Sequence, residues 1–187
     1  MHKIYTAFDE TNHGKYPEIF VMVSTTDKKY TKEYYEEKGK RTIRWTTERL
    51  VKFFSSRENS FRCIALRNKN GLNRLPEVIP LLLNGVSEDY SRDLDFNLSL
   101  DGTIETMKKL ISDNLEEFNI TKISYYPKIT NEPHYPYTSL LTIADSLASH
   151  LRRREEIIAN PDSKRRNHKL ISFNKKIHLE ERILRPI

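Results

Sequence analysis

Short runs of β-branched and aromatic residues alternate with polar breaks through the first third of the chain. Ile4–Asp9, Ile19–Ser24 and Phe61–Arg67 predict three strands, because such side chains favour the pleated backbone and the Asn, Gly and Pro residues that follow end it. An insertion of about residues 25–60 separates the second strand from the third. Its charge-dense part, residues 27–42, predicts a solvated segment.

The later part of the insertion carries a different pattern. Within Thr42–Ser56, apolar residues recur at helical spacing and predict a helix with one face on the core, namely Trp45, Leu50, Phe53 and Phe54. Further on, Leu75–Leu83 predicts a short buried helix that tolerates Pro80 and stops at Gly85. The polar stretch Ser87–Asp95 predicts a loop.

A strand, a helix and a strand then follow one another. Phe96–Leu100 alternates as a strand that ends at Asp101, Thr103–Phe118 has the period of an amphipathic helix, and Ile120–Tyr126 is a strand again. A segment of this length is a βαβ crossover, so we expect the two strands to be parallel.

The last predicted element is a long helix. Pro127–Pro136 predicts a loop, after which Thr138 or Ser139 caps a helix from Leu140 to about Ile158. This helix is apolar nearly all round, yet Asp145 stands in its middle. Asp145 is then either a surface residue on a half-exposed helix or a carboxylate that needs a partner.

Composition bounds the class of protein. The chain has 187 residues, enough for one domain with an appendage, and 31% of them are charged. It contains no apolar run long enough to span a bilayer and no signal-peptide pattern, so we expect a cytoplasmic protein. The single cysteine, Cys63, predicts a small core residue in a reducing compartment.

The net charge of +6 is concentrated at the C-terminus. Residues 151–187 hold 11 Lys and Arg against 5 Asp and Glu, while residues 1–150 hold 21 of each. We therefore expect a domain over residues 1–158 and a basic extension over 159–187. A local basic excess is typical of a polyanion partner such as DNA or RNA, although a charged tail can also serve solubility. The residues expected to bind nucleic acid are Arg152, Arg153, Arg154, Lys164, Arg165 and Arg166. Apolar residues in the same extension suggest that it docks on the domain or forms a homodimer.

Three carboxylates occupy positions that suit a metal site. Asp9 ends the first predicted strand, Asp101 ends the fourth, and Asp145 lies on the last helix. An unpaired carboxylate in an apolar setting must be neutralised or coordinated, and a divalent cation is one natural partner because hard cations take carboxylate oxygens.

The order of elements and two local motifs resemble the ribonuclease H-like superfamily. Asp9-Glu-Thr-Asn12 is similar to the Asp-Glu-Ser-Gly opening of RNase H-like families of unknown function, often carried by mobile elements. Ile143-Ala-Asp-Ser-Leu-Ala148 is similar to their Ala-Asp-x-x-Ala helix. The chain departs from the pattern at Thr11 and Asn12, so the substrate class is not carried over.

The resemblance implies an α/β fold with a five-stranded mixed sheet of order 3-2-1-4-5, flanked by helices. It also implies that Asp9, Asp101 and Asp145 converge as catalytic metal ligands for two Mg²⁺ or Mn²⁺ ions. Glu77, Asp93 and Asp95 are alternatives to Asp101 as the third carboxylate. Glu10 and His13 are candidate supporting residues, and His134 is a further candidate for contacts with phosphate.

Three functions fit these expectations. The first is a metal-dependent nuclease that hydrolyses phosphodiester bonds of DNA or RNA. The second is a catalytically inactive protein that binds nucleic acid or serves assembly with the same fold, and the third is a hydrolase of small phosphorylated nucleotides.

Overall fold

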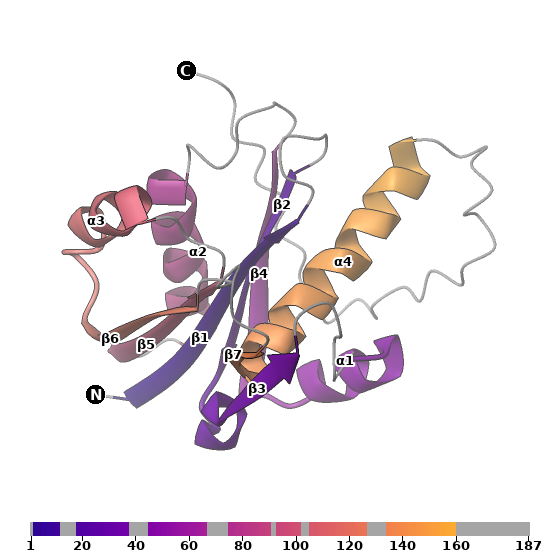
Figure 1. The fold of residues 1–187 in the computed structure, drawn as a ribbon, viewed down its shortest axis with the longest axis horizontal. Coiled ribbons are helices and arrows are strands. Elements are labelled where there is room, and N and C mark those ends of the chain that lie inside the picture. Colours follow the sequence, from indigo (N-terminus) through magenta and orange to yellow (C-terminus); the bar gives the residue numbers. More distant parts are fainter. Residues whose placement is uncertain are drawn as a thin grey trace.

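The computed structural model describes residues 2–11, 18–37, 45–66, 75–90, 93–101, 105–126 and 134–159. Its main sheet has five strands, β1 (His2–Thr11), β2 (Glu18–Thr25), β4 (Asn59–Leu66), β5 (Leu94–Asp101) and β6 (Ile120–Tyr126). They lie in the order β4-β2-β1-β5-β6 (Figure 1). β2 is antiparallel to β1 and to β4, whereas β5 is parallel to β1 and to β6. The expected order 3-2-1-4-5 and the parallel βαβ pair are both confirmed.

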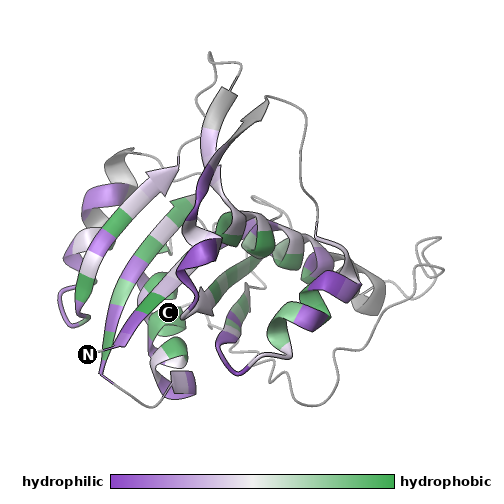
Figure 2. Cartoon of the chain, turned by 90° about the horizontal axis from the view of Figure 1, so that it is seen from below, coloured by the Kyte–Doolittle hydropathy of each residue, from purple (hydrophilic) through white to green (hydrophobic). Residues whose placement is uncertain are grey.

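Helices cover both faces of this sheet (Figure 1). α2 (Leu75–Tyr90) and α3 (Glu105–Asp113) pack on one face, and α4 (Ser139–Ala159) and α1 (Thr47–Phe54) pack on the other. The strands supply alternate residues to the two cores: Phe8 of β1 belongs to the α2 side and Ala7 to the α4 side. Figure 2 shows the resulting alternation of hydrophobic and hydrophilic positions along the strands.

The helix α2 is longer than its sequence predicts. It runs through Pro80 and Gly85 to Tyr90, so the predicted stop at Gly85 is wrong. The predicted loop from Ser87 to Asp95 is wrong over 87–90, which is helical, and over 94–95, where β5 begins. Gly85 serves a close approach: a Cβ at this position would lie 3.0 Å from Cγ of Arg62 on β4. Arg62 then donates to both carboxylate oxygens of Asp89 at 3.0 and 2.6 Å, which holds the last turn against the sheet.

The first part of the insertion is folded, and its side chains from 27 to 34 are exposed or half-buried, as expected of a solvated segment; residues 38–42 of the predicted range lie outside the described residues. It forms the short 3₁₀ helix η1 (Lys28–Thr31) and the strand β3 (Glu33–Glu37). β3 pairs antiparallel with β7 (His134–Thr138), which occupies the end of the predicted loop 127–136. Tyr30 and Tyr34 are partly buried against the α4-side core, and the Tyr34 hydroxyl forms a hydrogen bond with that of Thr142 on α4. Partners more than 100 residues away along the chain therefore order this charge-dense segment.

Several boundaries shift while the elements themselves are confirmed. β1 continues past Asp9 to Thr11, and α1 and α3 are shorter than the predicted helices 42–56 and 103–118. Thr138 caps α4, because its Oγ1 accepts the backbone N–H of Leu141 at 3.2 Å. Cys63 is buried in the core, as predicted. Among the described helices, none combines the length and apolar character needed to cross a membrane.

Candidate functional site

The sheet topology brings Asp9 and Asp101 to the same end of two neighbouring strands. Each follows directly on a paired residue, Phe8 of β1 and Leu100 of β5. Because β1 and β5 are parallel, their carboxyl ends meet at the same edge of the sheet. Asp101 is the last residue of β5 and pairs with Tyr126 of β6. An antiparallel β5 would have put the two residues at opposite ends.

Asp9 is a buried carboxylate on the side of the sheet that α4 covers. It follows Ala7 at the strand period of two, and Ala7 packs in the α4-side core. Only 6% of Asp9 is exposed, and its Oδ1 accepts the backbone N–H of Glu10 at 2.9 Å. Removing a carboxylate from water costs free energy unless hydrogen bonds or a positive charge compensate it. A buried carboxylate of this kind takes part in specific polar interactions.

Asp145 lies in the middle of α4, as predicted. α4 packs against β1 and β2, and the helix neighbours of Asp145 at three and four residues, Ala148 and Leu141, are fully buried. Asp145 itself is half-buried. It thus borders the helix face that covers β1, on the same side of the sheet as Asp9.

The alternatives to Asp101 lie elsewhere. Asp95 pairs with Lys3, six positions before Asp9 on β1, and its carboxylate accepts a hydrogen bond from Thr121. Asp93 precedes β5, at the same amino end of the strand. Glu77 is exposed on α2, which packs on the opposite face of the sheet. Of the four candidates, only Asp101 directly follows the partner of Phe8, the residue before Asp9.

The supporting residues divide between described and undescribed parts of the chain. Glu10 is half-buried next to Asp9, whereas His13 lies outside the described residues. His134 is the first residue of β7. Arg152 is half-buried on α4, and Arg153 and Arg154 belong to the same helix. The remaining basic candidates, Lys164, Arg165 and Arg166, and the extension that holds them lie outside the described residues.

Carboxylate oxygens are the donors that Mg²⁺ and Mn²⁺ take, so the residue types of the proposed set fit such an ion. The side chains of Asp9 and Asp145 are described and that of Asp101 is not. Within the described side chains, no group of three or more His, Cys, Asp and Glu residues is arranged to hold a metal.

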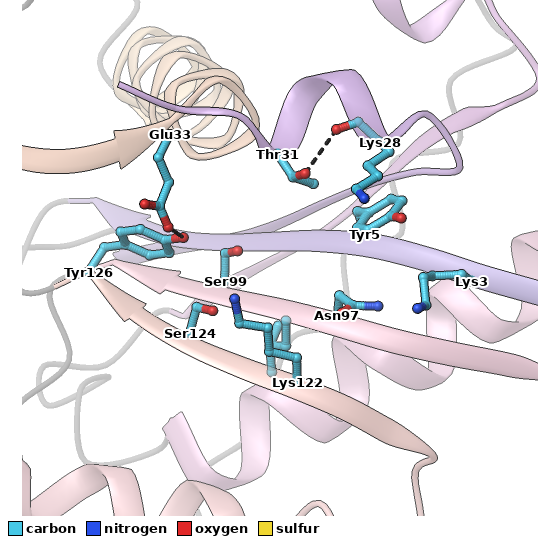
Figure 3. A pocket seen from close by; sticks show the side chains of 11 residues that line it. Lys3, Tyr5, Lys28, Thr31, Glu33, Asn97, Ser99, Lys122, Ser124 and Tyr126 are labelled. Carbon is cyan, nitrogen blue, oxygen red and sulfur yellow. Dashed lines mark hydrogen bonds between the residues drawn. The ribbon is translucent and has the colours of Figure 1, made fainter. Parts of the chain in front are cut away.

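A cavity that the sequence did not predict opens on the α4 side of the sheet, beneath the insertion (Figure 3). It has a volume of about 250 Å³. Its floor comes from alternate residues of three strands, and η1 with the start of β3 closes it from above. The floor residues that carry polar side chains are Lys3, Tyr5, Asn97, Ser99, Lys122 and Ser124.

One side of the cavity is closed by a contact between the two sheets. The Tyr126 hydroxyl of β6 donates a hydrogen bond to Oε1 of Glu33 on β3 at 2.9 Å. Burial and this neighbouring carboxylate raise the pKa of the Tyr126 phenol to about 12. The phenol therefore stays protonated and keeps the hydrogen bond at neutral pH.

The sequence does carry a signal for the face of β5 and β6 that forms the cavity floor. A strand of a parallel sheet that is covered on both faces is usually a continuous apolar run. In β5 and β6, polar residues instead take every second position, as in Asn97, Ser99, Lys122 and Ser124. This alternation indicates one face that no helix covers.

Neither protein-family models nor curated protein sequences gave a match to the chain. Among solved structures, it is similar to a chain in the structure of the PCNA:RNase HII complex from Archaeoglobus fulgidus. The two share 11% sequence identity with a TM-score of 0.49, over 86% of this chain and 77% of the other. A likeness of this size carries no functional conclusion. The strand order and strand directions of the sheet are those expected from the sequence.

Proposed function

We propose that the protein is a divalent-metal-dependent nuclease, of the RNase H-like type that opens on an Asp-Glu-Ser-Gly-like motif. The observation that supports this proposal is the parallel pairing of β1 with β5, in which Phe8 and Leu100, the residues directly before Asp9 and Asp101, are partners. The buried position of Asp9 and the packing of α4 over β1 add to it.

In this proposal Asp9, Asp101 and Asp145 hold Mg²⁺ or Mn²⁺, with two ions expected. When bound, the ions would supply the positive charge that activates a water molecule and stabilises the leaving oxygen of a phosphodiester. The protein contributes a fixed arrangement of carboxylates: Asp9 is held by the hydrogen bond from Glu10 N–H, and the ladder between β5 and its neighbours fixes the backbone of Asp101. Basic residues of α4 and the C-terminal extension would bind the nucleic acid.

The competing function is a nucleic-acid-binding or assembly protein that has the fold without the activity. The basic excess of residues 151–187 supports it, because positive charge alone is enough to bind the phosphates of a nucleic acid. The two functions differ in their need for metal, because a protein that only binds requires basic residues and no carboxylate cluster.

The test is cleavage of single-stranded and duplex DNA and RNA with Mg²⁺, with Mn²⁺ and with a chelator, together with Mn²⁺ binding by calorimetry. Asp9→Asn, Asp101→Asn and Asp145→Asn keep the shape of each side chain but remove the charge. We expect each to lower the cleavage rate by about a hundredfold or more, because loss of a metal ligand removes several kcal/mol of transition-state stabilisation.

Asp93→Asn is the matched control, because Asp93 is an exposed aspartate at the opposite end of β5. It should cleave and bind Mn²⁺ as the wild-type protein does. Unchanged cleavage in any of the three site variants would remove that residue from the metal site. Nucleic-acid binding without cleavage under any of the metal conditions would decide for the binding protein.

A further inference from the structure

The cavity beneath the insertion has a positive lining that comes from three separate segments. Lys3 stands on β1, Lys122 on β6 and Lys28 on η1 above them (Figure 3). None of the three forms a salt bridge with a residue that the structure describes. Like charges repel and are usually spread apart or paired on a protein surface, so their convergence on one cavity favours an anion there.

The one carboxylate in the described lining already accepts a hydrogen bond. Glu33 is the acidic residue of the described lining, and its Oε1 already accepts the hydrogen bond from Tyr126. With three lysines against this one carboxylate, the cavity keeps a positive balance at neutral pH.

Neutral hydrogen-bond donors complete the lining. Nδ2 of Asn97 is buried and has no acceptor in the described part of the chain, which leaves a donor unsatisfied on the cavity floor. A buried donor without an acceptor costs free energy, and an anionic oxygen would remove that cost. The hydroxyls of Ser99 and Ser124 lie next to it on the floor. Ammonium groups together with amide and hydroxyl donors are the groups that bind phosphate oxygens in proteins.

The ring of Tyr5 adds an aromatic surface to the same cavity, on β1 between Lys3 and Asp9. Aromatic side chains beside cationic groups bind nucleotides because the base stacks while the phosphate is neutralised. We propose that this cavity is a binding site for the phosphate group of a nucleotide.

The site lies on the same strand and the same side of the sheet as Asp9. Tyr5 precedes Asp9 by four residues, about 13 Å at the rise of a β-strand. A nucleic-acid strand that runs along β1 would meet both places. Phosphate binding in the cavity does not depend on the proposed nuclease function, whereas occupation by a nucleic acid that is also cleaved rests on it.

Two probes distinguish the sources of the phosphate. Thymidine 5′-monophosphate carries a free terminal phosphate, and an unphosphorylated oligothymidylate of about ten nucleotides carries internal phosphodiesters only. Binding of each is measured by calorimetry or fluorescence anisotropy at low salt without divalent metal. The proteins are the full-length wild type, Lys28→Gln/Lys122→Gln, Asn97→Ala and the control Lys52→Gln/Lys109→Gln, whose two lysines are exposed on α1 and α3.

We expect the Lys28→Gln/Lys122→Gln variant to bind at least one probe about tenfold more weakly than both the wild type and the control. This estimate follows because loss of one exposed lysine weakens binding by up to about fivefold. For the oligonucleotide, the slope of log affinity against log salt should become shallower by about 1.4, because each of the two lost contacts with a single strand contributes about 0.7. Asn97→Ala should weaken the same probe without changing the salt slope, because it removes a neutral donor. Weakening confined to thymidine monophosphate assigns the site to a free nucleotide, and weakening confined to the oligonucleotide assigns it to nucleic acid.

Equal affinity of the cavity variant and the control for both probes would overturn the proposal, as would the absence of binding of either probe to the wild type. Because no metal is present, this result is independent of cleavage. A protein that fails to cleave can still bind phosphate here, and a protein that cleaves can still lack this site. Thermal melts confirm that the variants are folded. We expect this because the four replaced lysines are exposed, and because Asn97→Ala removes a half-buried side chain whose Nδ2 has no acceptor in the described part of the chain.

Discussion

Replacement of Tyr126 by Phe tests the contact that joins the main sheet to the insertion. The change removes the hydroxyl that donates to Glu33 Oε1 at 2.9 Å and leaves the buried ring in place. A hydrogen bond to a charged acceptor contributes about 1.5–3 kcal/mol, and the exposure of Glu33 to water lowers this. We expect Tyr126→Phe to reduce the free energy of unfolding by about 1–1.5 kcal/mol near pH 7.

The effect should depend on pH with a definite sign. The pKa of Tyr126 is raised from 10.0 to about 12 by burial first and by the Glu33 carboxylate second, so the folded protein holds this proton more tightly than the unfolded chain. The stabilisation from this shift is complete below pH 10 and is lost as the pH rises toward 12. At about 1.4 kcal/mol per pH unit, and somewhat less after solvent screening, about 1 kcal/mol is lost by pH 11. Phe cannot ionise, so the two proteins should approach equal stability near pH 11.

The assay is urea denaturation followed by circular dichroism at several pH values from about 7 to 11, with the linear extrapolation of the free energy of unfolding. Tyr125→Phe is the matched control, because the contacts of the Tyr125 hydroxyl with the described residues are longer, 3.3 Å to the Lys108 carbonyl and 3.4 Å to Ser112 Oγ. It should cost under about 0.5 kcal/mol. Equal stability of wild type and Tyr126→Phe at pH 7, or a difference that stays constant from pH 9 to 11, would refute the role assigned to this contact.

Three further predictions concern the rest of the chain. Leu147→Ala should cost about 3 kcal/mol in urea denaturation, because Leu147 is fully buried where α4 meets the sheet; a loss below about 1 kcal/mol would contradict this packing. Asp89→Asn should lower the free energy of unfolding by about 1–2 kcal/mol, because it removes the charged partner that accepts two hydrogen bonds from the Arg62 side chain, which is 11% exposed. Glu88→Gln should change the stability little, because Glu88 lies 3.7 Å from Arg62. Equal effects of the two variants would refute the role assigned to Asp89. Neutral replacements in the C-terminal basic segment should flatten the slope of log affinity for duplex DNA against log salt by several units, at about 0.9 per lost contact. An unchanged slope would show that the charges of this segment only face water. The residues to replace are Arg152, Arg153, Arg154, Lys164, Arg165 and Arg166.

The order of elements in the main domain follows from the sequence because each element carries its own local signal. The period of two in Phe96–Leu100 and the helical spacing on both sides of it depend only on near neighbours along the chain. The βαβ connection then determines that β5 and β6 are parallel, since a crossover of that length allows little else. The positions of Asp9 and Asp101 near the ends of two strands follow from the same signals.

The folded state of the insertion was decided by tertiary structure. Its charged residues indicate a solvated segment and give no sign of regular structure, but Tyr34 is half-buried against the α4-side core and β3 is completed by β7, neither of which is near in sequence. The length of α2 has a similar origin. Pro80 and Gly85 weaken a helix locally by about 3 and 1 kcal/mol, yet burial of Val78, Leu82 and Val86 against the sheet and the Arg62–Asp89 contact outweigh this.

The cavity likewise exists only in three dimensions. Lys3, Lys28 and Lys122 are far apart along the chain and each looks like an ordinary surface lysine in the sequence. They converge because β1 and β6 flank β5 in the sheet and the insertion folds back over that face. Local periodicity can specify a strand and the side on which a residue lies, but the electrostatic field of a site depends on distances between segments, and only the packed chain sets those distances.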